Sequence, residues 1–264
     1  MENLLNATAR GFILFGREIT WYGVIIAVGM IIGVIMAYLI CKKKGYNLNM
    51  PLDLAIAALP CAIVGARLYY CIFNGVNSFG EIFAIWDGGM AIYGGVIGGF
   101  LGVLLCCKIK KYKLLQACDI CAPCLLLGQA IGRIGCYYSS CCYGVETTNP
   151  NLQFFPISVQ IDGVWHLANF FYESFFNLIG VVILLIITAK TKNNGYVTAG
   201  YFIIYGIIRA VLESFRDPAQ LLTIGSSSIG VSLVLSLILV AVGFVIIIFN
   251  LKNKSKNKEA EVNE

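Results

Sequence analysis

Arginine and glutamate recur at helical spacing in the segment YGIIRAVLESFRD, near the end of the chain. Arg209 and Glu213 are four residues apart, so they lie on one face of a helix, and Arg216 follows within the next turn. An isolated pair of this kind is most simply a structural ion pair inside a helical bundle. Arg67 and Arg133 also lie within apolar segments, so arginines outnumber the carboxylates that can pair with them. This excess predicts a site for an anion, because the planar guanidinium group matches phosphate oxygens in a bidentate way.

Counting helical rise places these charged groups in one layer. A helix rises about 1.5 Å per residue, so Arg67 lies about 21 Å beyond Asp53, and Arg133 is similarly placed beyond Asp119. Glu173 stands near the start of its own apolar segment, at the same level. Charged groups inside a membrane span are rare and usually face a protein interior or a wet cavity. We therefore expect four helices to bring ionisable groups together in one half of the membrane.

The elements that must position these groups are membrane helices. Of the 264 residues, 59% are hydrophobic and only 12% are charged, which excludes an ordinary soluble domain. A helix needs about 20 apolar residues to cross about 30 Å of hydrocarbon. Seven segments meet that length: residues 20–40, 53–73, 90–107, 116–135, 169–189, 199–215 and 230–249. The sequence therefore predicts an all-α membrane protein with seven transmembrane helices.

Lysine placement predicts how the helices are oriented. All thirteen lysines fall at four places: residues 42–44, 108–113, 190–192 and 252–258. These places follow the first, third, fifth and seventh spans, so they share one side of the membrane, and the positive-inside tendency makes that side the cytoplasm. We expect the N-terminus outside and the C-terminus in the cytoplasm. Residues 1–250 would form one polytopic membrane domain and residues 251–264 a charged cytoplasmic tail.

Six segments together resemble the prolipoprotein diacylglyceryl transferase family of bacterial inner-membrane enzymes. They are ITWYG (19–23), GARLYY (65–70), WDGGMAIYGG (86–95), GRIGCYYSSCCYG (132–144), FYES (171–174) and YGIIRAVLESFRDP (205–218), and they occur in the family's order. The resemblance implies transfer of the diacylglyceryl group of phosphatidylglycerol to the lipobox cysteine thiol of a prolipoprotein, with release of glycerol phosphate. It also implies a multi-pass protein of the bacterial plasma membrane, with its active site toward the outer leaflet. The partners would be phosphatidylglycerol, lipobox peptides and the bilayer.

The resemblance also implies roles for single residues. The arginine of the family's GRIG signature falls on Arg133, which would bind the lipid headgroup, and that of its YGxxRxxxE motif falls on Arg209. The catalytic residues implied are Arg133, Arg209, Glu213, Tyr93 and Glu173. The contacts implied for phosphatidylglycerol are Arg133, Arg209, Arg67, Arg216, Tyr22, Gly94, Gly95 and Gly144. We expect no metal ion, no cofactor and no nucleic-acid partner, and we expect a monomer.

The chain departs from the family pattern at two places. The family's GGMxxHGG segment has a histidine, a candidate base, where this chain has Tyr93. Tyrosine is protonated at neutral pH, so Tyr93 would be a poor base. The family's two asparagines and glutamate after GRIG are replaced by Cys136, Ser139 and Cys141, whereas Gly144 matches. The base therefore stays unassigned at this point.

Three explanations of these departures remain open. The substrate thiol can lose its proton through water or Glu173, with Tyr93 orienting the headgroup. His166, the only histidine of the chain, can approach the site. Alternatively, the chain is a divergent relative that acts on another nucleophile, or an inactive one. A different class of function, an anion or lipid transporter with an arginine-lined site, is the further alternative.

The eleven cysteines give a weaker signal. Their odd number excludes a complete disulfide framework, and most lie inside spans, where cysteine acts as a small apolar residue. Cys118, Cys121 and Cys124 lie in one helix without a fourth ligand, so they do not predict a metal site. Cys136, Cys141 and Cys142 either pack or line the site, form a disulfide, or supply a reactive thiol.

Overall fold

The computed structural model describes residues 11–14, 17–75, 89–139, 141–191, 193–217 and 230–262. Most of the N-terminal segment expected outside, and most of the outer loops expected at 74–89 and 216–229, lie beyond the described residues. The chain divides into two compact units, and each is described by itself. One comprises residues 34–121, and the other comprises residues 1–33 together with 122–264.

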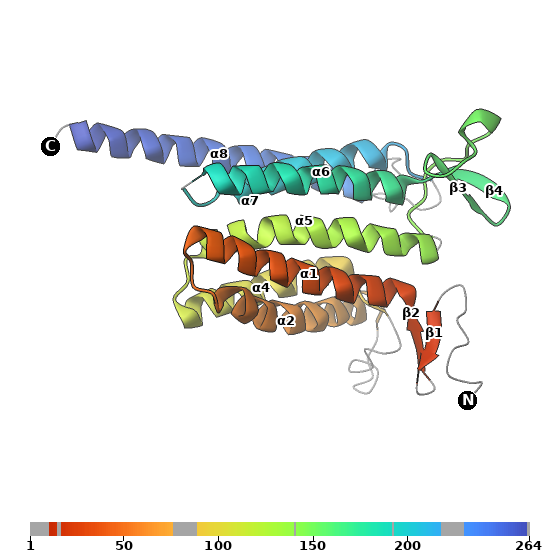
Figure 1. Cartoon of the computed structure of the whole chain (residues 1–264), viewed down its shortest axis with the longest axis horizontal. Helices are drawn as coiled ribbons and strands as arrows, with labels where there is room; N and C mark the ends of the chain where they lie inside the picture. The colour runs from red at the N-terminus through yellow and green to blue at the C-terminus, as the bar shows by residue number, and fades with distance from the viewer. Residues whose placement is uncertain are drawn as a thin grey trace. The chain divides into compact units, whose positions relative to one another are not determined.

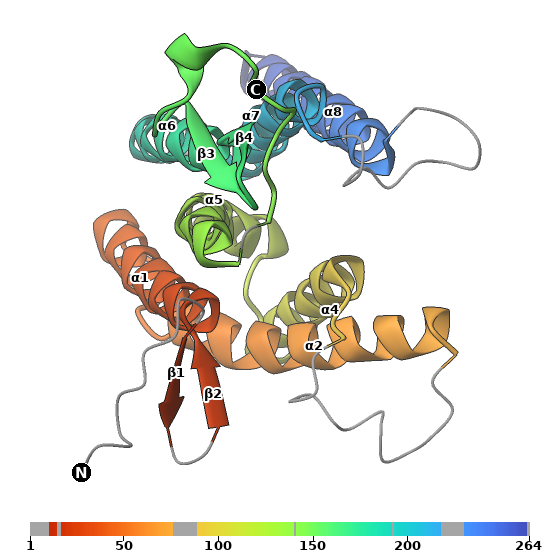
Figure 2. The same cartoon turned by 90° about the vertical axis from the view of Figure 1, so that its right-hand side faces the viewer.

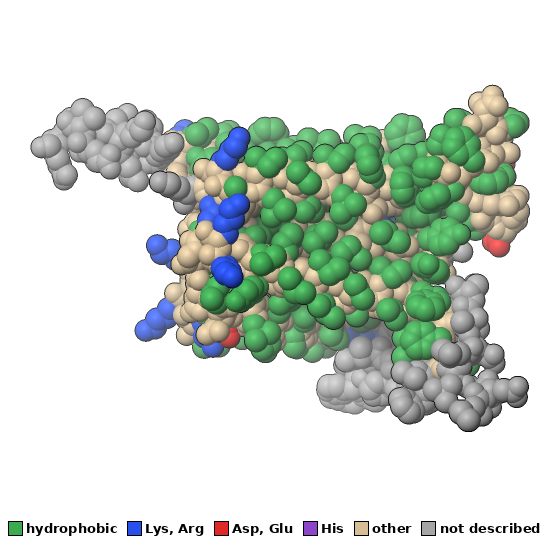
Figure 3. All heavy atoms as spheres, in the orientation of Figure 1, with side chains coloured by type: hydrophobic (Ala, Val, Ile, Leu, Met, Phe, Trp, Pro, Cys, Tyr) green, Lys and Arg blue, Asp and Glu red, His purple; other side chains and the backbone are tan. Residues whose placement is uncertain are grey.

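Seven helices among the described residues are long and apolar enough to cross a membrane (Figure 1). They are α1 (Trp21–Lys44), α2 (Met50–Phe73), α4 (Ile92–Lys110), α5 (Leu114–Tyr138), α6 (Asn169–Lys190), α7 (Tyr196–Glu213) and α8 (Val231–Val262). Their outer surfaces expose many large hydrophobic side chains, which cover the visible sides of the helices in Figure 3. The predicted seven-helix membrane fold is confirmed. The part of α8 that is apolar enough to cross a membrane ends at Lys252, and the helix continues into the charged tail.

Two short antiparallel hairpins lie outside the helices. The pattern of long apolar segments did not predict them. The first pairs β1 (Gly11–Leu14) with β2 (Arg17–Thr20), and the second pairs β3 (Ser158–Ile161) with β4 (Val164–Leu167). Asp162 and Gly163 connect β3 to β4 with positive φ angles of 49° and 85°. An Asp-Gly pair favours this turn, because both central residues of a type I′ hairpin need positive φ. A 3₁₀ turn, η2 (Pro150–Leu152), precedes this second hairpin.

Within residues 34–121, α2 and α4 pack at very short range. Gly94, Gly98 and Gly102 of α4 face α2, where added Cβ atoms would strike backbone atoms of Gly65, Cys61 and Ala57. The two helices lie side by side in Figure 1 and again in the turned view of Figure 2. The four-residue glycine spacing gives α4 a small face, which lets the two helices approach closely.

The other unit holds a bundle of helices around polar and apolar contacts. Ser174 of α6 donates to the Ala130 carbonyl of α5 at 2.8 Å. Gly180 of α6 leaves room for side chains of α5 and α7, and Gly206 of α7 lies against the Ser236 carbonyl of α8. Helices α6, α7 and α8 are grouped in both cartoon views (Figures 1 and 2). This packing holds the start of α6 and the end of α7 next to the end of α5.

The glycine contacts of α4 give a prediction about stability. Gly98→Ala adds a Cβ against the Cys61 carbonyl, so it should lower the free energy of unfolding by about 1–3 kcal/mol through overpacking. Gly99→Ala is the matched control, because its Cβ would meet Ala62 at 3.4 Å, an ordinary contact, and alanine favours a helix by about 0.5–1 kcal/mol. Thermal unfolding of both variants in detergent measures the difference. Equal midpoints for the two variants would contradict this account of the packing.

Candidate active site

Glu173 lies at the centre of the charged cluster. It is 3% exposed and is carried by the first turns of α6. Its Oε2 accepts a hydrogen bond from Arg209 Nη1 at 3.0 Å, and its Oε1 lies 3.0 Å from Arg133 Nε. The second contact is an ion pair whose angle falls outside hydrogen-bond geometry. One buried carboxylate thus holds an arginine from α5 and another from α7.

Glu213 extends the cluster along α7. Its Oε2 lies 3.3 Å from Arg209 Nη2 and 3.4 Å from Arg216 Nη1. Arg209 Nη2 also donates to Ser232 Oγ at 2.7 Å, which ties the guanidinium group to the start of α8. Arg209 is therefore fixed by two carboxylates and one hydroxyl, so its orientation is set before any ligand arrives.

The cluster carries excess positive charge. Three arginines, Arg133, Arg209 and Arg216, meet two carboxylates, those of Glu173 and Glu213. Arg133 and Arg216 keep 22% and 21% of their side chains exposed, whereas the carboxylates are almost fully buried. Arg216 Nε is buried and has no hydrogen-bond partner among the described residues. The buried charge of +1 and the unused donor suit an anion with several oxygen acceptors.

A loop after α5 holds Arg216 in place. Gly144 pairs with Arg216 in an isolated antiparallel bridge, and Val145 N–H donates to the Phe215 carbonyl at 3.0 Å. An added Cβ on Gly144 would lie 2.6 Å from the Phe215 carbonyl and 2.8 Å from Asn169 Oδ1. Only glycine fits there, so the family position Gly144 has a structural reason in this fold.

The cysteines that follow α5 contact the arginines. The Cys141 N–H donates to the Cys136 carbonyl at 3.1 Å, which turns the chain back over the helix end, and Cys142 has a left-handed φ of 60°. Arg133 Nη1 donates to Cys142 Sγ at 3.1 Å, and Arg216 Nη2 lies 4.0 Å from the same sulfur. The Cys136 and Cys141 thiols, together with these two cations, lower the pKa of the Cys142 thiol despite its burial. The Cys142 sulfur is therefore the hydrogen-bond acceptor among the three thiols.

His166 lies next to this loop. Its Nδ1 is 3.1 Å from the Gly144 carbonyl and 3.7 Å from Asp217 Oδ2, and its ring packs against Tyr143 at 4.6 Å. The hydrogen bond to the carbonyl requires the proton on Nδ1. His166 thus lies next to Gly144, which pairs with Arg216, and to Asp217, which follows Arg216. The position of His166 in the sequence did not predict this placement.

The unit of residues 34–121 holds the other predicted site residues. Arg67 is buried, donates from Nη1 to the Gly89 carbonyl at 3.1 Å and lies 5.6 Å from the Tyr70 ring centroid. Gly89 has a φ of 66°, and a Cβ there would meet the Tyr70 ring. Tyr93 is 39% exposed, with its ring 6.4 Å from that of Tyr69.

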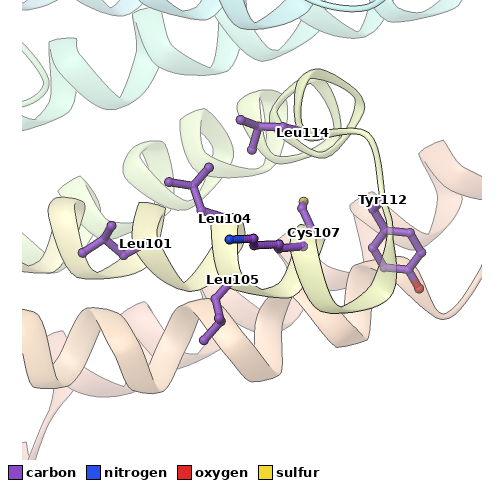
Figure 4. A pocket seen from close by; sticks show the side chains of 7 residues that line it. Leu101, Leu104, Leu105, Cys107, Tyr112 and Leu114 are labelled. Carbon is purple, nitrogen blue, oxygen red and sulfur yellow. The ribbon is translucent and has the colours of Figure 1, made fainter.

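A shallow hollow in the same unit lies beside α4 (Figure 4). Its lining residues are Leu101, Leu104, Leu105, Cys107, Lys108, Tyr112 and Leu114. None of them is a predicted site residue. The hollow is lined mainly by apolar side chains and offers one cation, so it carries no catalytic constellation.

Comparison with known proteins identifies the family. Residues 11–249 match the family model described as prolipoprotein diacylglyceryl transferase. A protein of Finegoldia magna named phosphatidylglycerol–prolipoprotein diacylglyceryl transferase is 38% identical over 231 residues, which cover 86% of this chain and 90% of that protein. A Listeria monocytogenes protein of the same name is 37% identical over 230 residues, 84% of this chain and 82% of its own length. This chain belongs to the prolipoprotein diacylglyceryl transferase family. The match is to a transferase, and an anion transporter is not favoured.

The family's signature positions divide between the two units. Arg133, Arg209, Glu213 and Glu173 lie together with Arg216 in one network, as the depth argument predicted for the first four. Tyr22 packs its ring against Gly135, two residues beyond Arg133. The family positions Arg67, Tyr93, Gly94 and Gly95 lie in the unit of residues 34–121. There Gly94 contacts α2, whereas a Cβ on Gly95 would be accommodated at ordinary distances, the nearest atoms being 3.6 Å away.

Sequence reasoning missed two participants of the site, Ser232 and Asp217, and left the role of Cys142 open. Ser232 gave no signal, because a serine at the start of an apolar helix is ordinary. Asp217 follows the family arginine Arg216 directly and would have been found by asking what faces His166. The approach of Cys142 to Arg133 depends on the left-handed residue after α5, which spacing in the sequence does not reveal.

The lowered pKa of Cys142 gives a prediction about reactivity with pH. An ordinary cysteine has a pKa near 8.5, so its alkylation slows about tenfold per pH unit below that value. A folded-state pKa below the ordinary value keeps Cys142 as a thiolate at lower pH, so its labelling by iodoacetamide should change little between pH 8 and pH 6. Mass spectrometry of the labelled peptide measures the rate, with glutathione as reference. A tenfold fall per unit, parallel to glutathione, would contradict the arrangement.

Proposed function

We propose that this protein transfers the diacylglyceryl group of phosphatidylglycerol to the lipobox cysteine thiol of prolipoproteins and releases glycerol phosphate. The observation that carries the proposal is the pair of arginines, Arg133 and Arg209, held on the two oxygens of Glu173. The named relatives are transferases for these two substrates, and family membership covers most of the chain.

The site is proposed to face the outer leaflet of the bacterial plasma membrane. Basic side chains occupy the last turns of α1, α4 and α6, which supports a cytoplasmic location for those helix ends. The N-terminus then lies outside and the C-terminus inside. We further propose that residues 1–250 act as one membrane domain with residues 251–264 as its charged tail, and that the protein works as a monomer.

Arg133 and Arg209 are proposed to bind the headgroup phosphate. Three arginines face only two carboxylates, and the phosphodiester of phosphatidylglycerol carries a charge of −1, so it can replace the Cys142 sulfur as the partner of Arg133 and Arg216. Arg216 adds its free Nε as a further donor. Glu173 and Glu213 act by orienting the arginines, since Glu173 faces an arginine with each oxygen and Glu213 Oε2 faces Arg209 and Arg216. Gly144 permits the close backbone packing that fixes Arg216.

The chemical step is a displacement at carbon. The sulfur of the substrate thiolate attacks the glyceryl carbon that carries the phosphate ester, a carbon–sulfur bond forms, and the carbon–oxygen bond to phosphate breaks. The leaving glycerol phosphate takes the electron pair as added negative charge on its oxygens. Preorganised guanidinium groups stabilise that charge as it develops, which is the main contribution this site can make to the rate.

The substrate thiol must first lose its proton. Glu173 is a poor base here, because both of its oxygens face arginines. We propose that water takes the proton, with the arginine field favouring the thiolate. We further propose that Tyr93 orients the headgroup, and that phosphatidylglycerol is contacted by Arg67, Gly94 and Gly95 in the unit of residues 34–121 and by Tyr22 in the other unit.

Removing either central arginine should abolish most transfer. Arg133→Ala and Arg209→Ala should each lower the rate about 100-fold or more, the usual effect of losing a charge-stabilising donor. The measurement is incorporation of labelled diacylglycerol from phosphatidylglycerol into a lipobox peptide by purified protein. Lys43→Gln is the charge-matched control, because Lys43 lies exposed in the last turn of α1. Absence of product with the unchanged protein, where a known relative works, would refute the proposed function.

Replacing Tyr93 tests the role proposed for it. Tyr93→Phe removes the hydroxyl, so it should raise KM for phosphatidylglycerol about tenfold while kcat changes less, because orientation of the lipid is lost. Complementation of a cell depleted of its own transferase should succeed with the unchanged chain and with Tyr93→His. Rescue by Tyr93→His alone would show that the natural chain has another task.

A further inference from the structure

Three thiols converge where α5 ends. The sulfur atoms of Cys136, Cys141 and Cys142 all lie within 4.8 Å of one another. Cys136 is buried, whereas Cys141 and Cys142 are partly exposed, so the group can be reached from one side. The thiols pack against Ala168 and Phe170 at the start of α6, so buried apolar side chains cover the other side of the group.

This spacing fits a metal ion bound by thiolates. Zinc–sulfur bonds are about 2.3 Å long, so three sulfurs around one ion stand about 3.8–4.0 Å apart. A disulfide instead needs two sulfurs at about 2.05 Å, and a third thiol would then be unexplained. No fourth His, Cys, Asp or Glu joins the group among the described residues, so one position stays open to an outside ligand.

The surrounding charge also fits such an ion. Three thiolates and one divalent cation carry a net charge of −1, and the arginine–glutamate network beside them carries +1. Arg133 Nη1 already donates to Cys142 Sγ at 3.1 Å, and Arg216 Nη2 lies 4.0 Å away. Hydrogen bonds from cations to ligating groups are a common way to stabilise a metal site.

We propose that Cys136, Cys141 and Cys142 form a binding site for a thiophilic divalent cation of the zinc type. The ion binds the Cys142 thiolate and replaces the protons of the Cys136 and Cys141 thiols, which are released to solvent. The sequence did not predict this site, because the spacing of one cysteine followed five residues later by an adjacent pair lacks a fourth ligand. The turn after α5 brings the three sulfurs together.

Metal binding should compete with the lipid headgroup, a consequence that rests on the proposed function. The bound trithiolate takes up the positive charge of Arg133 and Arg216 that would otherwise meet a phosphate. Occupation of the site therefore weakens phosphatidylglycerol binding. Soft divalent cations outside the cell then act as inhibitors of the enzyme.

The direct test is metal stoichiometry of the full chain. Protein purified in detergent with a phosphine reductant is equilibrated with Zn²⁺, freed of unbound ion by gel filtration and analysed by mass spectrometry of the element. We expect about one zinc per chain. The triple variant Cys136→Ala/Cys141→Ala/Cys142→Ala should retain about a tenth of that or less. The matched control Cys118→Ala/Cys121→Ala/Cys124→Ala, which removes the same number of thiols from α5, should retain all of it.

A second measurement needs no variant. Zn²⁺ should protect Cys141 and Cys142 of the unchanged protein from maleimide at least tenfold, mapped by peptide mass, and Cd²⁺ should give a sulfur-to-metal charge-transfer band in the ultraviolet. No zinc on the unchanged chain, equal zinc on both triple variants, or unprotected thiols would overturn the proposal. A Cys136–Cys141 disulfide that persists in reductant would do the same.

The transferase assay separates this proposal from the proposed function. Zn²⁺ should raise KM for phosphatidylglycerol severalfold in the unchanged protein and leave the Cys141→Ser variant unaffected relative to its own metal-free rate. Stoichiometric zinc binding without any transferase activity would retain the metal site and remove the proposed function. Zinc binding with unchanged KM would remove the competition and overturn that part of the inference.

Discussion

The contact of one buried carboxylate, Glu173, with two arginines is the interaction on which the rest of the site depends. A charged side chain placed within a membrane helix is costly unless it is paired and hydrogen-bonded. Glu173 offers one oxygen to Arg133 of α5 and the other to Arg209 of α7, so three helices share one centre of paired charges. Glu213, Ser232 and the loop around Gly144 then hold Arg209 and Arg216 in place. What remains is one arginine more than the carboxylates in a confined place, which is the property needed to hold a lipid phosphate and to receive the charge of a leaving phosphate.

The predictable part of this structure follows from periodicity and depth. The length of the apolar segments predicted the seven spans, and helical rise placed Arg133, Glu173 and Arg209 at one level. The unpredicted part lies where the backbone leaves the helix. The left-handed Cys142, the β3–β4 hairpin and the bridge between Gly144 and Arg216 depend on turns and on contacts between segments far apart in sequence. Hydrophobic pattern says little about such segments, since short turns bury little apolar surface.

Two thiols, those of Cys136 and Cys141, and the hydroxyl of Ser139 stand where the family has two asparagines and a glutamate, which changes the chemistry beside Arg133. An amide or carboxylate there would satisfy the guanidinium group strongly, whereas a sulfur is a weaker and softer acceptor. The chain therefore keeps the family's arginines but surrounds the first of them with groups that respond to soft metal ions.

The central claim, that Arg133 and Arg209 act as one unit through Glu173, is tested most directly by a double-mutant cycle on phosphatidylglycerol binding. Arg133→Lys and Arg209→Lys keep the charge but remove the planar fork that Glu173 engages. Lipid affinity is measured for the unchanged protein, both single variants and the double variant in detergent micelles. The account predicts that the double variant loses much less than the sum of the single losses, with a coupling of about 1 kcal/mol or more. Losses that add within about 0.5 kcal/mol would show independent arginines and contradict the account.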